Sequence, residues 1–197
     1  MTNRFIGSVK KALPVIFFLV FVSLFLFRET FTKGFVPVPA DTLVGSYFPW
    51  LDYKWGYQVG VPVKNPPISD VFSQFFVWKY QLIDIFKQGS WPLWNDHSFS
   101  GTPLLATYHS AAFFPANIFF LLPKFLGWSI YIASSTFIAA LGMYLFTRNW
   151  IKSKPARLVA AVIFSLAGPM TTWSEFGTGV WAAAMLPCIL FFVDAII

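Results

Sequence analysis

Four long apolar runs without a charged residue dominate this sequence, and they constrain its fold more than any other feature. They cover residues 12–27, 125–147, 158–174 and 176–193. A helix needs about 20 predominantly apolar residues to cross the hydrocarbon core of a bilayer. A soluble globule could not hide so much apolar surface in 197 residues that are 57% hydrophobic and 21% aromatic. We therefore predict an all-α integral membrane protein with about four transmembrane helices, at 10–27, 125–147, 158–174 and 176–195.

The distribution of basic residues predicts the orientation of these helices. Seven of the 14 basic residues lie in segments 1–11 and 148–157, which contain no acid, whereas residues 28–124 hold the other seven together with six acids. Cytoplasmic loops carry an excess of Lys and Arg. We predict a multi-pass protein of the cell membrane with a cytoplasmic N-terminus and an extracytoplasmic loop over 28–124. This pattern explains the net charge of +6 without a nucleic-acid partner.

The first apolar run has a second interpretation as a cleaved signal peptide, which would also begin with basic residues. No small-residue cleavage site closely follows Phe27, so an uncleaved anchor is favoured. Cysteine usage adds little. Cys188 is the only cysteine, which excludes a disulfide within this chain and favours a small buried apolar side chain.

Two short helices are expected within the extracytoplasmic loop. Ser69 follows two prolines and is the expected N-cap, and Gly89 stands at the position of a C′ glycine. The polar residues from Asp70 to Gln88 share one face, which predicts an interfacial helix over 70–88. Residues 111–122 are apolar but would span only ~18 Å as a helix, so we predict a re-entrant or interfacial helix. The aromatic stretch 91–115 has too many polar residues to cross a bilayer and connects these two helices.

Three acids on the predicted outer side are candidates for chemistry. Asp41 follows the first apolar run, Asp70 begins the interfacial helix, and Glu175 lies between the last two runs. A carboxylate can act as a general base when partial burial raises its pKa toward the working pH. A structural role is the alternative to a general-base role for both aspartates. Asp70 would compensate the helix dipole at a helix start, and Asp41 would form an Asx turn.

No cofactor is expected from the spacing of potential ligands. A zinc site needs three or four ligands at matched spacing, and His97 and His109 stand 12 residues apart with no such set around them. A divalent metal therefore has no support in the sequence. Either histidine could instead bind an anionic phosphate or transfer a proton, or simply anchor the loop at the interface.

Three stretches carry a family resemblance: SDVFSQFFVW (69–78), GSWPLWNDHSFSGTPLLA (89–106) and SAAFFPANIFFLLP (110–123). They resemble the bacterial YfhO-like membrane proteins, which are related to the GT-C glycosyltransferases. The resemblance implies the N-terminal part of a GT-C-like fold. It also implies an enzyme that transfers a sugar from a polyprenyl-phosphate donor to an extracytoplasmic acceptor, a glycan or protein of the cell envelope.

The same resemblance implies roles for individual residues. Asp70 matches the acid of the SDVFSQ element and is the expected catalytic base, with Asp41 as the second candidate. The expected substrate-binding residues are His109, Asn95, Trp94, Gln74, Lys64 and Glu175. Two departures concern the acceptor side, because Asp96-His97 replaces a Pro-aromatic pair and His109 stands where Gln is expected. We expect the chain to be the front part of a longer protein, and these residues alone need not form an active enzyme.

The alternative is a non-catalytic membrane protein, either a lipid or polysaccharide flippase subunit or a structural membrane module. A transporter should place charged side chains within its spans. The predicted spans contain charged side chains only near their ends, at Lys10, Lys11 and Asp194, which favours a surface-site enzyme. In either case membrane lipids are expected partners.

Overall fold

The computed structural model describes residues 2–196, with side chains from residue 12 onward. The protein is mostly helical (71%), which confirms the all-α prediction. Strands β1 (Trp94–Asn95) and β2 (Thr102–Pro103) form a small antiparallel hairpin. The chain forms two compact units. The first contains Met1–Phe35, Ile132–Ser174 and Gly179–Ile197, and the second contains Val36–Tyr131 and Glu175–Thr178.

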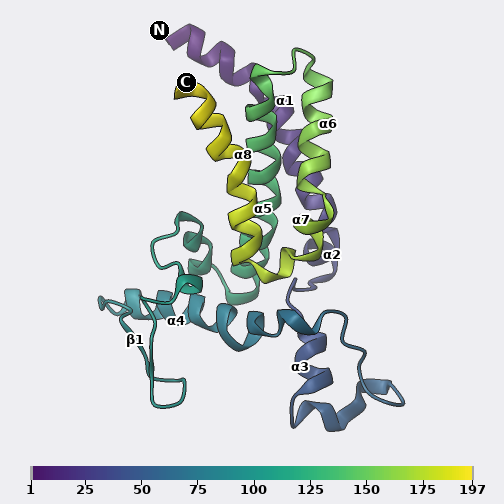
Figure 1. The fold of residues 1–197 in the computed structure, drawn as a ribbon, viewed down its shortest axis with the longest axis vertical. Coiled ribbons are helices and arrows are strands. Elements are labelled where there is room, and N and C mark those ends of the chain that lie inside the picture. The colour runs from purple at the N-terminus through teal and green to yellow at the C-terminus, as the bar shows by residue number, and fades with distance from the viewer. Residues whose placement is uncertain (1, 197) are drawn as a thin grey trace. The chain divides into compact units, whose positions relative to one another are not determined.

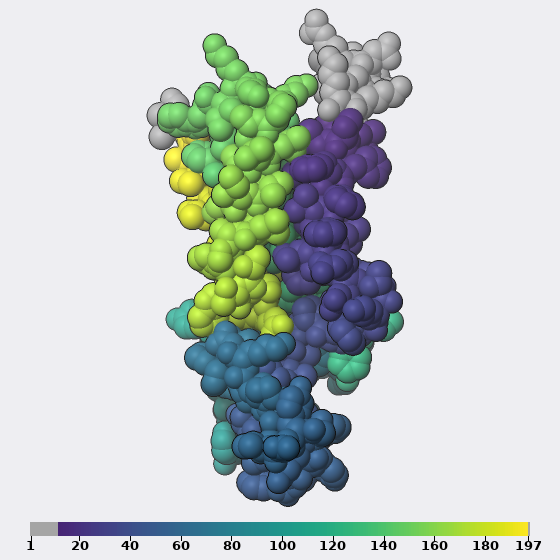
Figure 2. Space-filling view, turned by 90° about the vertical axis from the view of Figure 1, so that its right-hand side faces the viewer, coloured from purple at the N-terminus to yellow at the C-terminus, as the bar shows by residue number. Residues whose placement is uncertain are grey.

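The first unit is a helical bundle, visible in Figure 1. Its helices are α1 (Thr2–Leu26), α2 (Arg28–Lys33), the part of α5 (Lys124–Phe146) that begins at residue 132, α6 (Lys154–Ser165), α7 (Gly168–Thr172) and α8 (Thr178–Ile196), with a 3₁₀ turn η6 (Thr147–Asn149) after α5. Small residues lie where the helices touch. Ala140 of α5 and Ala161 of α6 pack with Leu19 of α1, and Figure 2 shows the surfaces of α1 and α6 side by side. Alanines at these positions let helix backbones approach closely.

Two helices within residues 2–196 are long and apolar enough to cross a membrane. They span Lys124–Asn149 and Thr178–Ile196, while the apolar part of α1, Ala12–Leu26, is shorter. In α8 large apolar side chains such as Leu186, Ile189 and Phe192 are exposed. Length, composition and this exposed apolar surface indicate an association with membranes.

The single helix predicted over 158–174 is wrong, because this segment is broken into two helices. Helix α6 ends at Ser165, Ala167 is extended with ψ 153°, and α7 begins at Gly168. Pro169 explains the break, since proline has no amide hydrogen and its ring clashes with the carbonyl four residues earlier. Helix α6 also starts earlier than predicted, where the Ser153 hydroxyl accepts a hydrogen bond from the Ala156 amide.

The second unit is built from short helices around α4 (Phe76–Lys87). In chain order the others are α3 (Ala40–Ser46), η1 (Trp50–Gly56), η2 (Pro66–Ile68), the π-helical turn η3 (Val71–Phe75), η4 (Tyr108–Ser110), η5 (Pro115–Leu121), the first turns of α5 and η7 (Ser174–Phe176). Phe75, Leu82 and Trp128 are among its buried side chains. The Trp128 indole also donates a 2.8 Å hydrogen bond to the Pro37 carbonyl, so the start of the unit is held against α5.

The helix expected over 70–88 runs from Val71 to Lys87 as η3 followed by α4. Gly89 follows the C-cap Gln88 with φ 73°, the left-handed conformation that the spacing predicts. The expected N-cap at Ser69 is wrong. Asp70 occupies the N-cap position instead, and its side chain makes no capping hydrogen bond.

The helix expected over 111–122 is shorter than predicted. Only Pro115–Leu121 is helical, in the tighter 3₁₀ form. Ala111 adopts a left-handed conformation with φ 42°, and Phe114 is extended because the residue before a proline avoids the helical region.

Candidate functional site

Three of the predicted site residues, Asp41, Lys64 and Glu175, line one cavity of about 240 Å³ inside the second unit. We call it the acidic cavity. Asp41 comes from the first turn of α3, Lys64 from the extended stretch before η2, and Glu175 from η7. The remaining wall is formed by Val38, Ala40, Asn65 and Ile68.

Two backbone hydrogen bonds fix the Asp41 carboxylate. Its Oδ1 accepts from the Thr42 amide at 3.0 Å and its Oδ2 from the Lys64 amide at 2.9 Å. Close packing supports this arrangement, because a Cβ at Gly45 would lie 2.7 Å from the Val61 carbonyl oxygen. Glycine therefore lets α3 lie directly against the stretch that carries Lys64, whose side chain remains exposed.

Glu175 is half-buried, and its environment favours the protonated form. Burial raises the pKa of the Glu175 carboxyl, the Asp41 carboxylate raises it further, and the Lys64 ammonium opposes both effects. A carboxylate with a raised pKa takes up a proton more readily near neutral pH, which is the property that a general base needs.

Asp70, the expected base, lies outside this cavity. Its Oδ1 accepts a 3.1 Å hydrogen bond from the Gln74 amide nitrogen, so these two predicted site residues form a pair of their own at the start of the π-helical turn. Neither residue lines the acidic cavity. Asp41 and Glu175 are brought together, and Asp70 does not join them.

His109 contacts the residues that follow Glu175 in the chain. Its Nδ1 is 3.1 Å from the Thr178 hydroxyl, and its ring centroid is 4.2 Å from that of Phe75. Phe176 contacts the same imidazole edge-on. His109 therefore packs against residues 176–178 but is not part of the cavity wall.

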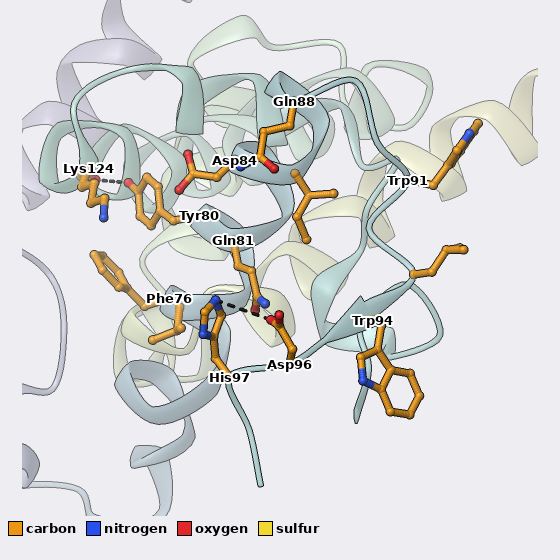
Figure 3. A pocket seen from close by; sticks show the side chains of 13 residues that line it. Phe76, Tyr80, Gln81, Asp84, Gln88, Trp91, Trp94, Asp96, His97 and Lys124 are labelled. Carbon is orange, nitrogen blue, oxygen red and sulfur yellow. Dashed lines mark hydrogen bonds and ion pairs between the residues drawn. The ribbon is translucent and has the colours of Figure 1, made fainter. Parts of the chain in front are cut away.

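A second, larger cavity lies between α4 and the residues leading into and out of β1. This aromatic groove has a volume of about 710 Å³ (Figure 3). Its lining side chains are those of Phe76, Val77, Tyr80, Gln81, Asp84, Ile85, Gln88, Trp91, Leu93, Trp94, Asp96, His97 and Lys124. Trp94, a predicted substrate-binding residue, is one of them and is exposed.

Asn95, another predicted binding residue, is buried and holds the groove together. Its Oδ1 accepts hydrogen bonds from the Gln81 side chain at 2.8 Å and from the His97 amide at 3.0 Å. Its Nδ2 donates to the Ser98 hydroxyl at 2.9 Å. These bonds use two acceptor positions of the amide oxygen and one of its two N–H groups, and the side chain is only 1% exposed, so Asn95 positions the loop and is not open to a ligand.

Sequence reasoning missed Lys79, which is 1% exposed in the core of the second unit. Its ammonium nitrogen donates to the Ser110 carbonyl and to the Asn117 side chain, both at 2.9 Å. A signal was present, because the residues three and four positions away on each side, Phe75, Phe76, Leu82 and Ile83, are all apolar. This spacing puts Lys79 on the buried face of the helix. The groove residues Asp84, Gln88 and Trp91 had no such local signal.

Within residues 2–196, no group of three His, Cys, Asp or Glu side chains is arranged to hold a metal ion. Comparison with known protein families, with curated proteins and with solved structures finds no match to this chain. The likeness to YfhO-like proteins therefore rests on the three quoted stretches of sequence.

Proposed function

We propose that this protein is a membrane glycosyltransferase that moves a sugar from a polyprenyl-phosphate donor to an extracytoplasmic acceptor, with the acidic cavity as its reaction site. One observation carries the proposal. Asp41, Lys64 and Glu175 are far apart in the sequence, yet they line a single cavity in which the charges of Asp41 and Lys64 both act on the Glu175 carboxyl. The transferase chemistry itself comes from the motif resemblance.

In this proposal Glu175 is the general base. It removes the proton from an acceptor hydroxyl as the hydroxyl oxygen attacks the anomeric carbon of the donor. The bond from that carbon to the phosphate oxygen breaks, the electron pair leaves with the lipid phosphate, and the configuration inverts. The Asp41 carboxylate supports proton uptake by Glu175, and the Lys64 ammonium attracts the departing phosphate.

The test is a transfer assay with the full chain in lipid nanodiscs. The donors are synthetic short-chain polyprenyl phosphates carrying radiolabelled glucose, mannose or galactose, and the acceptor is a cell-envelope fraction. General-base assistance contributes about 10²–10⁴ in rate, so Glu175→Gln should lower transfer by about a hundredfold or more. Asp41→Asn should also lower it, while the exposed-site control Asp52→Asn should not.

The Asp70→Asn variant separates the two possible bases. Its transfer rate should stay within a few-fold of the wild type, because Asp70 does not line the acidic cavity. Two results would contradict the acidic cavity as the reaction site. They are wild-type transfer rates in both Glu175→Gln and Asp41→Asn, or loss of transfer in Asp70→Asn alone. Either result would identify Asp70 as the base.

A second candidate, lipid binding by a flippase subunit, is favoured by one feature of the first unit. An apolar cavity of about 230 Å³ lies between α1 and α6, lined by Phe18, Phe21, Val22, Phe25, Leu26, Val162 and Leu166, with Arg28 as its only charged side chain. An acyl chain with a phosphate near Arg28 would suit this lining. Scrambling of a fluorescent phospholipid in proteoliposomes, unaffected by Glu175→Gln and reduced by Val162→Trp, would favour this candidate over the transferase.

A further inference from the structure

We infer that the aromatic groove between α4 and the β1 segment is a binding site for an uncharged saccharide. The further role of the groove as the acceptor site rests on the proposed transferase function. Saccharide binding itself can be measured without any transfer. The volume of about 710 Å³ falls within the range of roughly 300–1,000 Å³ that small-molecule sites occupy.

The lining combines the two kinds of group that a sugar ring requires. Trp91 and Trp94 both line the groove and are more than half exposed, so their aromatic rings are accessible to a ligand. The face of an aromatic ring carries negative potential, which attracts the weakly positive C–H groups on one side of a pyranose. Figure 3 shows Gln81 and Asp84 on α4 and Gln88 directly after it, across the groove from these two tryptophans.

The polar groups match hydroxyl groups in particular. Carboxylates accept hydrogen bonds, the Lys124 ammonium donates them, and side-chain amides do both. A sugar hydroxyl can donate and accept, so it can bond to all three kinds of group. Five of the 13 lining side chains are of these types, namely Gln81, Asp84, Gln88, Asp96 and Lys124, and the His97 imidazole is a sixth polar group. A purely apolar ligand would bury several of these groups without partners, which is costly.

The charges exclude an anionic ligand. Asp84 and Asp96 contribute two negative charges and Lys124 one positive charge, while His97 Nε2 lies 3.5 Å from the Asp96 carboxylate. The groove is therefore negative when His97 is neutral and balanced when it is protonated. A phosphate or a nucleotide would meet no excess of positive charge here, whereas a neutral saccharide has no charge to oppose.

The walls of the groove are held by contacts between the elements that form them. The hydrogen bond from Gln81 to Asn95 joins α4 to β1, and β1 pairs with β2. Gly101 lies directly against Trp94, since a Cβ at this position would overlap the indole, and its φ of 101° favours glycine. A site with fixed walls loses little conformational entropy when it binds a ligand.

Isothermal titration calorimetry of the full chain in nanodiscs tests the inference. The probes are maltotetraose, mannotetraose and chitotetraose, with inorganic phosphate as the anionic comparison. At least one tetrasaccharide should bind and phosphate should not. Trp94→Ala and Asp84→Asn should each weaken binding by about tenfold or more. The matched controls Phe99→Ala and Asp52→Asn change exposed residues outside the groove and should bind as the wild type does.

The inference is overturned if none of the three tetrasaccharides binds, if phosphate binds in their place, or if the groove variants bind with wild-type affinity. Asp84 on α4 and Gln88 directly after it are exposed, so Asp84→Asn and Gln88→Ala keep the test valid even if Trp94→Ala fails to fold.

Glu175→Gln separates the two proposals. Saccharide binding without any transfer contradicts the proposed function alone, and Glu175-dependent transfer without saccharide binding contradicts the groove alone.

Discussion

Lys79 illustrates at the scale of one residue how packing changes the chemistry of a side chain. Its two hydrogen bonds, to the Ser110 carbonyl and the Asn117 side chain, match the two N–H donors of a neutral amine. No carboxylate forms an ion pair with it among the side chains that the structure describes. Burial lowers the pKa of Lys79 from 10.5 to about 7. The residue therefore holds the segment around Ser110 and Asn117 to α4 without a permanent charge.

This lowered pKa makes the stability of the protein depend on pH. Between pH 7 and 10.5 the unfolded chain binds a proton at Lys79 that the folded protein does not, so the free energy of unfolding should rise with pH. The slope from this residue is at most about 1.4 kcal/mol per pH unit. Thermal unfolding measured from pH 6 to pH 10 should show a rise in Tm above pH 7, which Lys79→Met removes. An equal rise in Lys79→Met would contradict the assignment, and the exposed Lys87→Met serves as the control.

Lys64 provides a test of the reaction site that leaves the proposed base in place. Its positive charge lowers the pKa of Glu175, which burial and Asp41 raise. Lys64→Met should therefore raise the Glu175 pKa further. Because a general base must be deprotonated to act, the acidic limb of the transfer rate against pH should move to higher pH.

The matched control for this shift is Lys54→Met, an exposed lysine outside the acidic cavity, which should leave the limb where it is. An unchanged limb in Lys64→Met, with transfer still measurable, would show that the titrating base is not near Lys64.

At the scale of elements, the first unit depends on one close approach between α5 and α8. A Cβ at Gly142 would lie 2.6 Å from the Cys188 sulfur and 3.1 Å from the Cys188 amide nitrogen. Gly142→Ala should therefore destabilise the protein by about 1–3 kcal/mol, as overpacking usually does. A drop in Tm during thermal unfolding in detergent measures this effect.

Gly168 is the control for that substitution, since a Cβ there would meet nothing within 4 Å. Gly168→Ala should leave the Tm unchanged or raise it slightly, because alanine loses less backbone entropy on folding. Equal effects of the two substitutions would mean that Gly142 is not a packing contact.

The elements also show why an apolar run alone does not define a helix. Residues 158–174 have the length and composition of a span, but Pro169 divides them into α6 and α7. Hydrophobic content decides whether a segment can be buried in lipid or protein, whereas backbone hydrogen bonding decides where a helix ends. The proline was visible in the sequence and outweighs the apolar pattern.

For the whole molecule, the charge distribution predicts a membrane topology that labelling can test. In a Cys188→Ala background, Asp52→Cys should react with a membrane-impermeant maleimide on intact cells, because residues 28–124 are expected outside. Lys152→Cys should react only after permeabilisation, since cytoplasmic loops are rich in basic residues. Both positions are exposed, so a difference in labelling between them would not result from burial. Labelling of both positions on intact cells would contradict this topology.

The sequence by itself determined the helical class, the apolar segments and the end of α4 just before Gly89. These features follow from composition, periodicity and capping, all of which act over a few residues. Only the tertiary structure decided that Asp41 and Glu175 line one cavity while Asp70 pairs with Gln74, and that side chains between residues 76 and 97 line a groove together with Lys124. These arrangements bring together residues that are distant in the sequence. They depend on the full set of long-range packing contacts, which no local sequence pattern encodes.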